Sequence, residues 1–225
     1  MTVRIRFLGG VGTVTGSKYL IETADTNFMV DCGLFQSVKN LHLRNWAPMP
    51  VDEEGIDAVL LTHAHLDHSG YLPRFVKSGF SGPVVSTMAT RDLCEVLLAD
   101  SGYLLEQDTE YANRHGFSKH RPALPLYTRD DAEACMSRFA PVTFGELRAG
   151  GKDAAARFLP ASHILGASII EVLCAGMKAA KALIWANWTF RTGVPLRALP
   201  EFSKRQLHLA PHLSQNPGQR DPSCW

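Results

Sequence analysis

The chain has 225 residues, 45% of them hydrophobic and 20% charged, which is typical of a globular protein with one sizeable core. The net charge of +1 is not the strong basic excess that marks many nucleic-acid-binding domains. No run approaches the roughly 18 apolar residues of a membrane span, and Arg4 and Arg6 interrupt the short apolar N-terminus where a signal peptide would continue. We therefore expect a cytoplasmic protein that does not cross a membrane.

Charge is distributed unevenly along the chain, whereas the cysteines are scattered. Residues 176–225 contain seven Lys or Arg and two Asp or Glu, a net charge of +5, whereas the sixteen Lys or Arg and twenty Asp or Glu before them give −4. The five cysteines are scattered and form no Cys-x-x-Cys pair. This spacing favours reduced thiols over a disulfide framework.

The chain opens with three predicted β-strands. Residues 3–8 alternate apolar and basic side chains, as a half-buried strand does, and residues 18–22 and 28–30 form two further strands around a turn. Asp31 follows the third strand directly and precedes Cys32 and a glycine. By itself, a carboxylate in this position is typical of a turn.

The most informative stretch is a cluster of three histidines and one aspartate that follows an apolar, β-prone run. The cluster consists of His63, His65, Asp67 and His68. Alternate side chains of an extended chain point to the same side, so His63 and His65 could bind one cation, while a turn into the next helix brings Asp67 and His68 toward a second. These ligand types favour zinc, and two adjacent metals with an open position suit a hydrolase. A loop of solvated histidines is the weaker alternative, because such a cluster at a strand-to-helix junction is improbable by chance.

Helices and strands alternate in the rest of the chain, which favours an α/β sandwich with its helices outside. Helices are predicted at 36–46, 72–76, 90–113 and 129–139, and strands at 83–86, 142–144, 157–159 and 169–173. A basic loop from Lys119 to Pro122 could contact phosphate, although such loops are more often simply solvated. His163 precedes the last predicted strand, and alone it is more typical of a buried, hydrogen-bonded histidine than of a metal ligand.

Several segments together resemble the metallo-β-lactamase superfamily of metallohydrolases, and in particular its β-CASP branch, which processes RNA. The His-x-His-x-Asp-His cluster after an apolar strand is the centre of this resemblance. The other matching segments are Gly9–Ser17, Val30–Gln36, Gly70–Pro73 and Ser162–Ser168. The resemblance covers about residues 3–175.

The resemblance implies an α/β fold, an incomplete αββα sandwich, and a metal centre with two Zn²⁺ ions. It assigns His63, His65 and His163 to the first ion, and Asp67 and His68 to part of the second.

The resemblance also implies roles for two aspartates. Asp67 is expected to act in catalysis as well as in metal binding. Asp31 is expected to support catalysis from behind the ligands, because metal-bound histidines need a carboxylate or similar partner to hold the correct tautomer.

The sequence departs from the family pattern after the apolar strand at 182–185. The family has a Ser-Gly-Asp-like turn there, whose aspartate bridges both metals, but no carboxylate lies between Glu171 and Glu201. The family's β-CASP insertion and last histidine ligand would follow, whereas residues 186–225 contain five prolines and no sustained helical or strand period. We therefore expect a partial metallo-β-lactamase-like domain at 1–185, an irregular, disordered tail at 186–225, and a truncated or frame-shifted copy of a longer enzyme.

The function implied by the resemblance is zinc-dependent hydrolysis of RNA phosphodiester bonds by a metal-bound hydroxide, as an endonuclease or an exonuclease. RNA is therefore the expected partner, and an apolar edge left by a missing domain would favour a homo-oligomer. Two alternatives remain open. A small-molecule thioester or lactone hydrolase of the same superfamily would use the same ligands, and a catalytically inactive fragment would keep the fold with one weakly held zinc.

Overall fold

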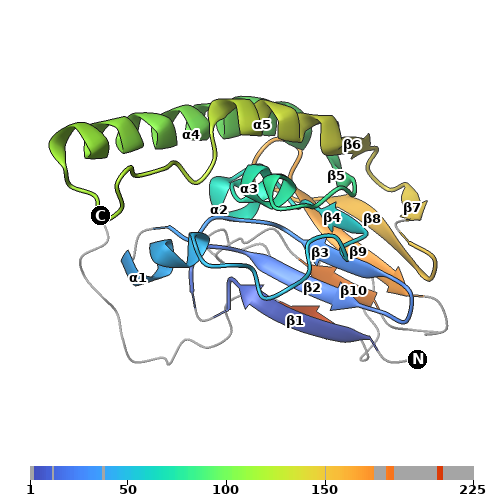
Figure 1. Cartoon of the computed structure of the whole chain (residues 1–225). Coiled ribbons are helices and arrows are strands. Elements are labelled where there is room, and N and C mark those ends of the chain that lie inside the picture. The colour runs from blue at the N-terminus through green and yellow to red at the C-terminus, as the bar shows by residue number, and fades with distance from the viewer. Residues whose placement is uncertain are drawn as a thin grey trace, which may run out of the picture.

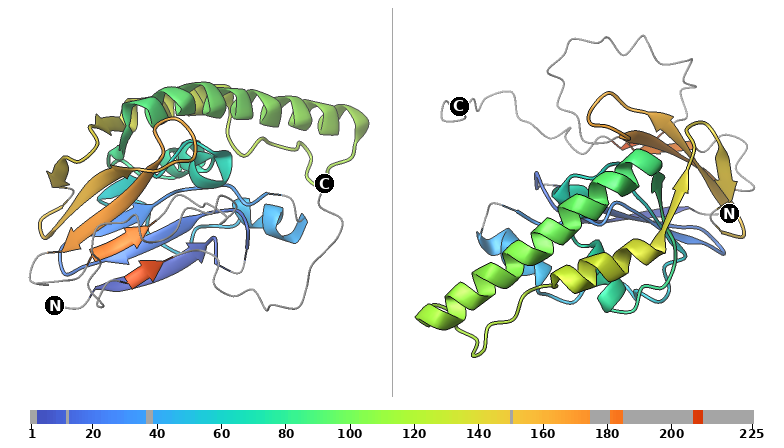
Figure 2. Two further views of the ribbon diagram at one scale, coloured as in Figure 1. Left: turned by 180° about the vertical axis from the view of Figure 1, so that it is seen from behind. Right: turned by 90° about the horizontal axis from the view of Figure 1, so that it is seen from above.

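A computed structural model describes residues 3–11, 13–36, 39–149, 151–174, 181–184 and 207–209. Two β-sheets lie face to face, and helices cover the outer face of the first sheet (Figure 1). Within the described residues, no helix covers the outer face of the second sheet (Figure 2). The α/β sandwich predicted from the sequence is confirmed, with three described layers.

The first sheet has six strands in chain order. They are β1 (Arg4–Gly9), β2 (Lys18–Glu22), β3 (Asn27–Val30), β4 (Ala58–Leu60), β5 (Val84–Thr87) and β6 (Phe139–Val142). β1, β2 and β3 form an antiparallel meander, whereas β3, β4, β5 and β6 run parallel. Parallel strands end at the same sheet edge, so the residues that follow β3, β4 and β5 meet there.

The second sheet has five strands in the order β11-β10-β9-β8-β7. They are β7 (Leu147–Ala149), β8 (Ala154–Pro160), β9 (Ser168–Cys174), β10 (Lys181–Ile184) and β11 (Leu207–Leu209). The helices are α1 (Lys39–His42), the 3-10 turn η1 (Leu43–Asn45), α2 (Leu66–Ser69), α3 (Leu72–Lys77), α4 (Met88–His115), α5 (Arg129–Cys135) and the 3-10 turn η2 (Met136–Arg138). None of the described helices is both long enough and apolar enough to cross a membrane.

Strand alternation builds two separate cores on the two faces of the first sheet. In β3, Phe28 and Val30 face the second sheet and pack with Phe158 and Ile170, whereas Met29 faces the helices. β2 and β4 alternate in the same way. The central strands β3, β4 and β5 are therefore packed on both faces, and this packing fixes the position of the sheet edge where they end.

One predicted strand differs from the structure, and one predicted segment lies mostly outside the described residues. The strand predicted at 142–144 is wrong, because β6 ends at Val142 and Phe144 is 40% exposed on the following turn. Pro141 is tolerated within β6 because this is an edge strand, where a missing N–H needs no partner. Of the predicted tail at 186–225, only 207–209 is described, as β11 beside β10, and the rest lies outside the described residues.

Lys18 is a buried cation at the start of β2. Only 4% of the residue is exposed, and its Nζ donates to the carbonyl of Gly33 and lies 4.6 Å from the ring centroids of Phe35 and Tyr71. Burial lowers the pKa of Lys18 to about 8, because low-dielectric surroundings disfavour the charged form. Burial also raises the pKa of the neighbouring Cys32 thiol to about 12, so no thiolate neutralises the ammonium at pH 7.

We predict that Lys18 makes the free energy of unfolding rise with pH between about 8 and 10.5. In this window the folded chain has lost a proton that the unfolded chain, with a lysine pKa of 10.5, still holds. Urea unfolding of wild type and of Lys18→Met at a series of pH values measures this effect. Across the window, the free energy of unfolding of wild type should rise relative to that of Lys18→Met by about 3 kcal/mol. Lys152→Met, at an exposed lysine, is the control and should leave the pH profile unchanged. A pH-independent difference for Lys18→Met would contradict the prediction.

Candidate metal centre

The candidate site lies at the edge of the first sheet where β3 and β4 end. His63 and His65 follow β4, and α2 begins directly after them and carries Asp67 and His68. His163 comes from the other sheet, in the loop between β8 and β9. The structure therefore brings together residues that lie 100 positions apart in the chain.

Three histidines converge on one point. A ring nitrogen of each of His63, His65 and His163 lies within 4.8 Å of the others. Nδ1 of His65 is 3.2 Å from Nε2 of His63 and 3.2 Å from Nε2 of His163. Two nitrogens bound at about 2.0–2.1 Å to a tetrahedral zinc ion would stand about 3.4 Å apart. The donor types and their spacing therefore fit a metal ion held by these three residues.

The surroundings keep two of these rings in the neutral form that binds metal. Burial, followed by the adjacent rings of His68, His163 and His65, lowers the pKa of His63 to about 2. Burial, followed by His65, also lowers the pKa of His163. A metal ion therefore does not need to displace a proton from either ring at neutral pH.

Asp31 lies at the bottom of the site and is fully buried. Its carboxylate accepts hydrogen bonds from the Thr62 backbone N–H at 2.8 Å, the Thr62 hydroxyl at 2.8 Å, the Ser17 hydroxyl at 3.3 Å and Nδ1 of His68 at 2.7 Å. Burial disfavours the charged form of His68, but the Asp31 carboxylate outweighs this and raises the pKa of His68. The hydrogen bond from Nδ1 to Asp31 fixes the orientation of the His68 ring, and its Nε2 lies 3.5 Å from the Asp67 carboxylate.

Thr62 is a site residue that the sequence analysis missed. Its hydroxyl proton is donated to Asp31, so its oxygen can only accept from Nδ1 of His63, at 3.0 Å. This hydrogen bond places the proton of His63 on Nδ1 and leaves Nε2 unprotonated, with its lone pair toward the other histidines and available to bind a metal ion. Its position next to His63 was the only signal in the sequence.

Backbone hydrogen bonds brace the turn after β3 against α2. Cys32 N–H donates to the carbonyl of His68 at 2.7 Å, and Leu34 N–H donates to that of Leu66 at 2.9 Å. Gly33 lies between them, and a Cβ at this position would stand 1.6 Å from the carbonyl oxygen of Asp67. Only glycine therefore allows this close approach, which holds the Asp31 turn beneath the histidines.

The loop that carries His163 is fixed to both the first sheet and α4. The hydroxyls of Thr87 and Thr90, at the start of α4, donate to the carbonyl of Gly166 at 2.7 and 2.9 Å. Ser168 N–H donates to the carbonyl of Thr62 at 2.9 Å. The third ligand is thereby held against the strand end that supplies the first two.

The structure places the predicted residues in two adjacent groups. His63, His65 and His163 form the three-residue group, and Asp67 and His68 lie beside it, with the rings of His63 and His68 4.1 Å apart. Among the described residues, no further ligand joins Asp67 and His68 in a group of three. The segment at 186–191, where the family has its bridging aspartate, lies outside the described residues.

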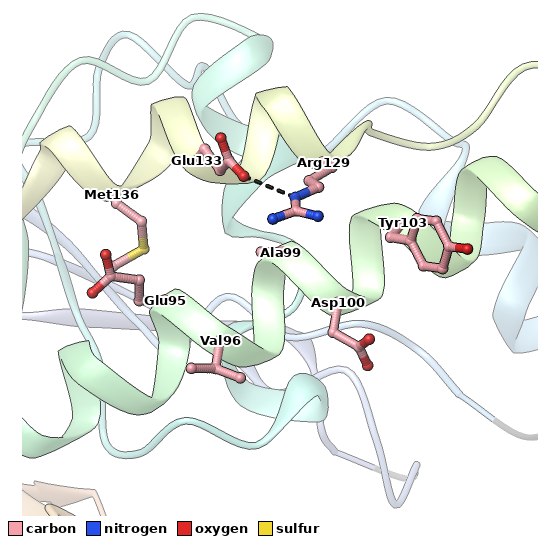
Figure 3. Close-up of a pocket in the computed structure, with 8 residues that line it drawn as sticks. All are labelled: Glu95, Val96, Ala99, Asp100, Tyr103, Arg129, Glu133 and Met136. Carbon is pink, nitrogen blue, oxygen red and sulfur yellow. Dashed lines mark hydrogen bonds and ion pairs between the residues drawn. The ribbon is translucent and has the colours of Figure 1, made fainter.

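A separate hollow of about 670 Å³ lies between α4 and α5 and contains none of the histidines (Figure 3). It is lined by Glu95, Val96, Ala99, Asp100, Tyr103, Arg129, Glu133 and Met136. Its three carboxylates outnumber the single cation, Arg129, whose Nε donates to Glu133 at 2.8 Å. An acidic hollow of this kind does not suit a phosphate ligand.

The geometry defines an α/β sandwich with a group of three histidines at one sheet edge that could hold a metal ion. Comparison with known families identifies it further: residues 11–102 match the metallo-beta-lactamase superfamily. The chain carries a metallo-beta-lactamase superfamily domain, and the resemblance predicted from the sequence is confirmed.

Curated relatives resemble most of the chain. It is 34% identical to Ribonuclease TTHA0252 of Thermus thermophilus over 169 residues. This alignment covers 75% of this chain and 34% of that protein. It is 33% identical to Transcription termination factor FttA of Methanocaldococcus jannaschii over 170 residues, and this alignment covers 76% of this chain and 25% of that protein. The chain therefore spans about a quarter to a third of the length of these relatives.

A solved structure supports the fold alone. The metallo-beta-lactamase fold protein YhfI from Bacillus subtilis is similar with a TM-score of 0.50 at 15% sequence identity, covering 84% of this chain and 64% of that one.

We predict that Asp31→Asn lowers affinity for Zn²⁺ by roughly 10- to 100-fold, because the amide cannot accept from Thr62 and His68 together as the carboxylate does. Competition with a chromophoric chelator measures this affinity, and circular dichroism checks the fold. Thr62→Val should also weaken binding while it keeps the Asp31 charge, whereas Asp92→Asn, on the exposed surface of α4, should bind as wild type does. Unchanged affinity in both folded site variants would show that the hydrogen bonds do not orient the ligands.

Proposed function

We propose that this chain carries a nucleic-acid hydrolase domain whose histidine centre holds zinc and whose substrate is RNA. The observation that carries the proposal is the convergence of His63, His65 and His163 at the edge of a metallo-beta-lactamase superfamily domain. The relatives named as a ribonuclease and as transcription termination factors support RNA as the substrate. The β-CASP-like sequence segments agree with this choice.

Zinc at such a site supplies Lewis acidity and lowers the pKa of a bound water to about 7. His63, His65 and His163 would hold the first ion, and Asp67 and His68 would supply part of a second site. The first assignment is supported by the imidazole ligands and by their spacing, because Nδ1 of His65 lies 3.2 Å from Nε2 of both His63 and His163.

The two aspartates have different positions and therefore different proposed roles. The side chain of Asp67 is 23% exposed beside His68, so its carboxylate can accept a hydrogen bond from a water and orient that water toward a phosphate. Asp31 is fully buried and cannot contact a substrate. It acts as a positioning residue, through its hydrogen bonds to Thr62 and His68.

We predict that the purified full chain binds at least one zinc ion and cleaves single-stranded RNA when Zn²⁺ is supplied. His63→Ala should lose the ion and reduce the cleavage rate by roughly 100-fold or more, because it removes a ligand of the proposed centre. Elemental analysis and gel electrophoresis of labelled RNA measure the two quantities. His42→Ala, at an exposed histidine of α1, is the control and should keep both.

The same assays separate the alternatives. Cleavage of a thioester or lactone but not of RNA would indicate a small-molecule hydrolase. Zinc content near one ion with no hydrolysis of any substrate would indicate an inactive domain that keeps the three-histidine site. Either result would overturn the proposal.

A further inference from the structure

α4 ends in a cluster of exposed aromatic rings. Tyr111 is 56% exposed and Phe117 is 70% exposed, and His115 lies between them. The ring centroids of Tyr111 and His115 are 4.2 Å apart, and those of His115 and Phe117 are 5.6 Å apart with planes 20° from parallel. Figures 1 and 2 show this end of α4 projecting beyond the sheets. Grouped apolar rings that remain exposed are typical of a binding surface.

The helix end holds these rings in place. Gly116 adopts a left-handed conformation with φ of 69° and ends the helix, and its N–H donates to the carbonyl of Ala112. Phe117 N–H donates to the same carbonyl at 3.1 Å, which folds the phenyl ring back toward the helix. Nδ1 of His115 donates to the carbonyl of Tyr111 at 3.0 Å. The stack is therefore preformed.

A closed loop follows the stack. The Asn113 side chain donates to the carbonyl of Ala123 at 3.0 Å and accepts from the Ala123 N–H at 2.8 Å. These two hydrogen bonds join the last turn of α4 to Ala123 and so close the loop at 116–122. The basic loop noted in the sequence is thereby held next to the aromatic rings.

This part of the chain is locally basic. Residues 111–123 contain Arg114, Lys119 and Arg121 and no acidic residue, and all three cations are exposed. None of them forms an ion pair within the described part of the chain. By contrast, α4 as a whole contains six acidic residues and two Lys or Arg. Unpaired cations gathered at one helix end match a polyanion.

We propose that this surface, the α4 platform, binds single-stranded RNA. It consists of Tyr111, His115, Phe117, Arg114, Lys119 and Arg121. Exposed rings on which bases stack, beside cations that contact phosphates, bind single strands with little sequence preference. The proposal rests on RNA as the substrate in the proposed function, and it adds a binding site distinct from the metal centre.

The platform is distant from the metal centre along α4. The helix has 28 residues and is therefore about 40 Å long. Its N-terminal end contacts the His163 loop through Thr87 and Thr90, whereas the platform lies at its C-terminal end. A short oligonucleotide bound at the metal centre does not reach the platform, whereas a long strand contacts both.

The first test is binding of a fluorescein-labelled RNA of about 20 nucleotides, measured by fluorescence anisotropy on the full chain with EDTA to prevent cleavage. Tyr111→Ala and Phe117→Ala should each weaken binding by roughly 5- to 100-fold, the loss expected for one stacked base. Tyr103→Ala is the matched control, because this tyrosine is 48% exposed on the same helix but lines the acidic hollow. Wild-type affinity in both platform variants would overturn the proposal.

The second test separates stacking from charge. An abasic strand of the same length offers phosphates without bases, so Tyr111→Ala should leave its binding unchanged. Lys119→Ala and Arg121→Ala should weaken both strands and reduce the slope of log affinity against log salt by roughly 0.7 each. Equal losses on both strands for Tyr111→Ala would indicate a structural effect and count against stacking.

Cleavage assays distinguish this proposal from the proposed function. Platform variants should cleave a short oligonucleotide at the wild-type rate and a long RNA more slowly at subsaturating concentration. Failure of wild type to cleave any RNA would overturn the proposed function and leave the binding tests to be judged separately. Normal cleavage of long RNA by the platform variants would overturn the platform alone, and would favour a protein as its ligand.

Discussion

The buried carboxylate of Asp31 is the constraint on which the geometry of the candidate metal centre depends. A charge removed from water is stable only when donors surround it. Those donors come from Ser17, Thr62 and His68, which lie on three different segments. Satisfying one carboxylate therefore brings the start of β2, the end of β4 and helix α2 together. It also determines which nitrogen of His63 and of His68 faces the centre.

The two sheets contribute to the centre unequally. His63 and His65 follow β4, a strand of the first sheet that is buried on both faces, whereas His163 belongs to a loop of the second sheet. The three ligands meet only if the sheets are packed in the right relation. A metal ion bound there would join the two sheets and would stabilise the folded chain, because it would bind that state preferentially.

Helix α4 links two regions with opposite electrostatic character. Its N-terminal end supports the His163 loop, its middle borders the acidic hollow beside α5, and its C-terminal end carries exposed rings and exposed cations. A net charge near zero conceals this separation. Local charge next to aromatic side chains, rather than total charge, therefore indicates where a polyanion would bind.

Much of this protein follows from the sequence alone. Strand alternation and the apolar run before His63 predict the sandwich, because burial on one or two faces leaves a periodic pattern. The spacing of His63, His65, Asp67 and His68 predicts a metal site, because a strand end and the turn into a helix bring neighbouring residues together.

Other features required the tertiary structure, because contacts between distant segments leave no local pattern. Thr62 is one hydroxyl among many until Asp31 lies beneath it. Gly33 is one glycine among many until its contact with Asp67 is seen. Tyr111, His115 and Phe117 read as parts of a helix and a loop until Gly116 turns the chain and stacks their rings. The sequence by itself predicted a metal site and determined the class of fold, because both leave local patterns, whereas the tertiary structure decided which distant residues surround the histidines and which aromatic rings and cations are exposed together.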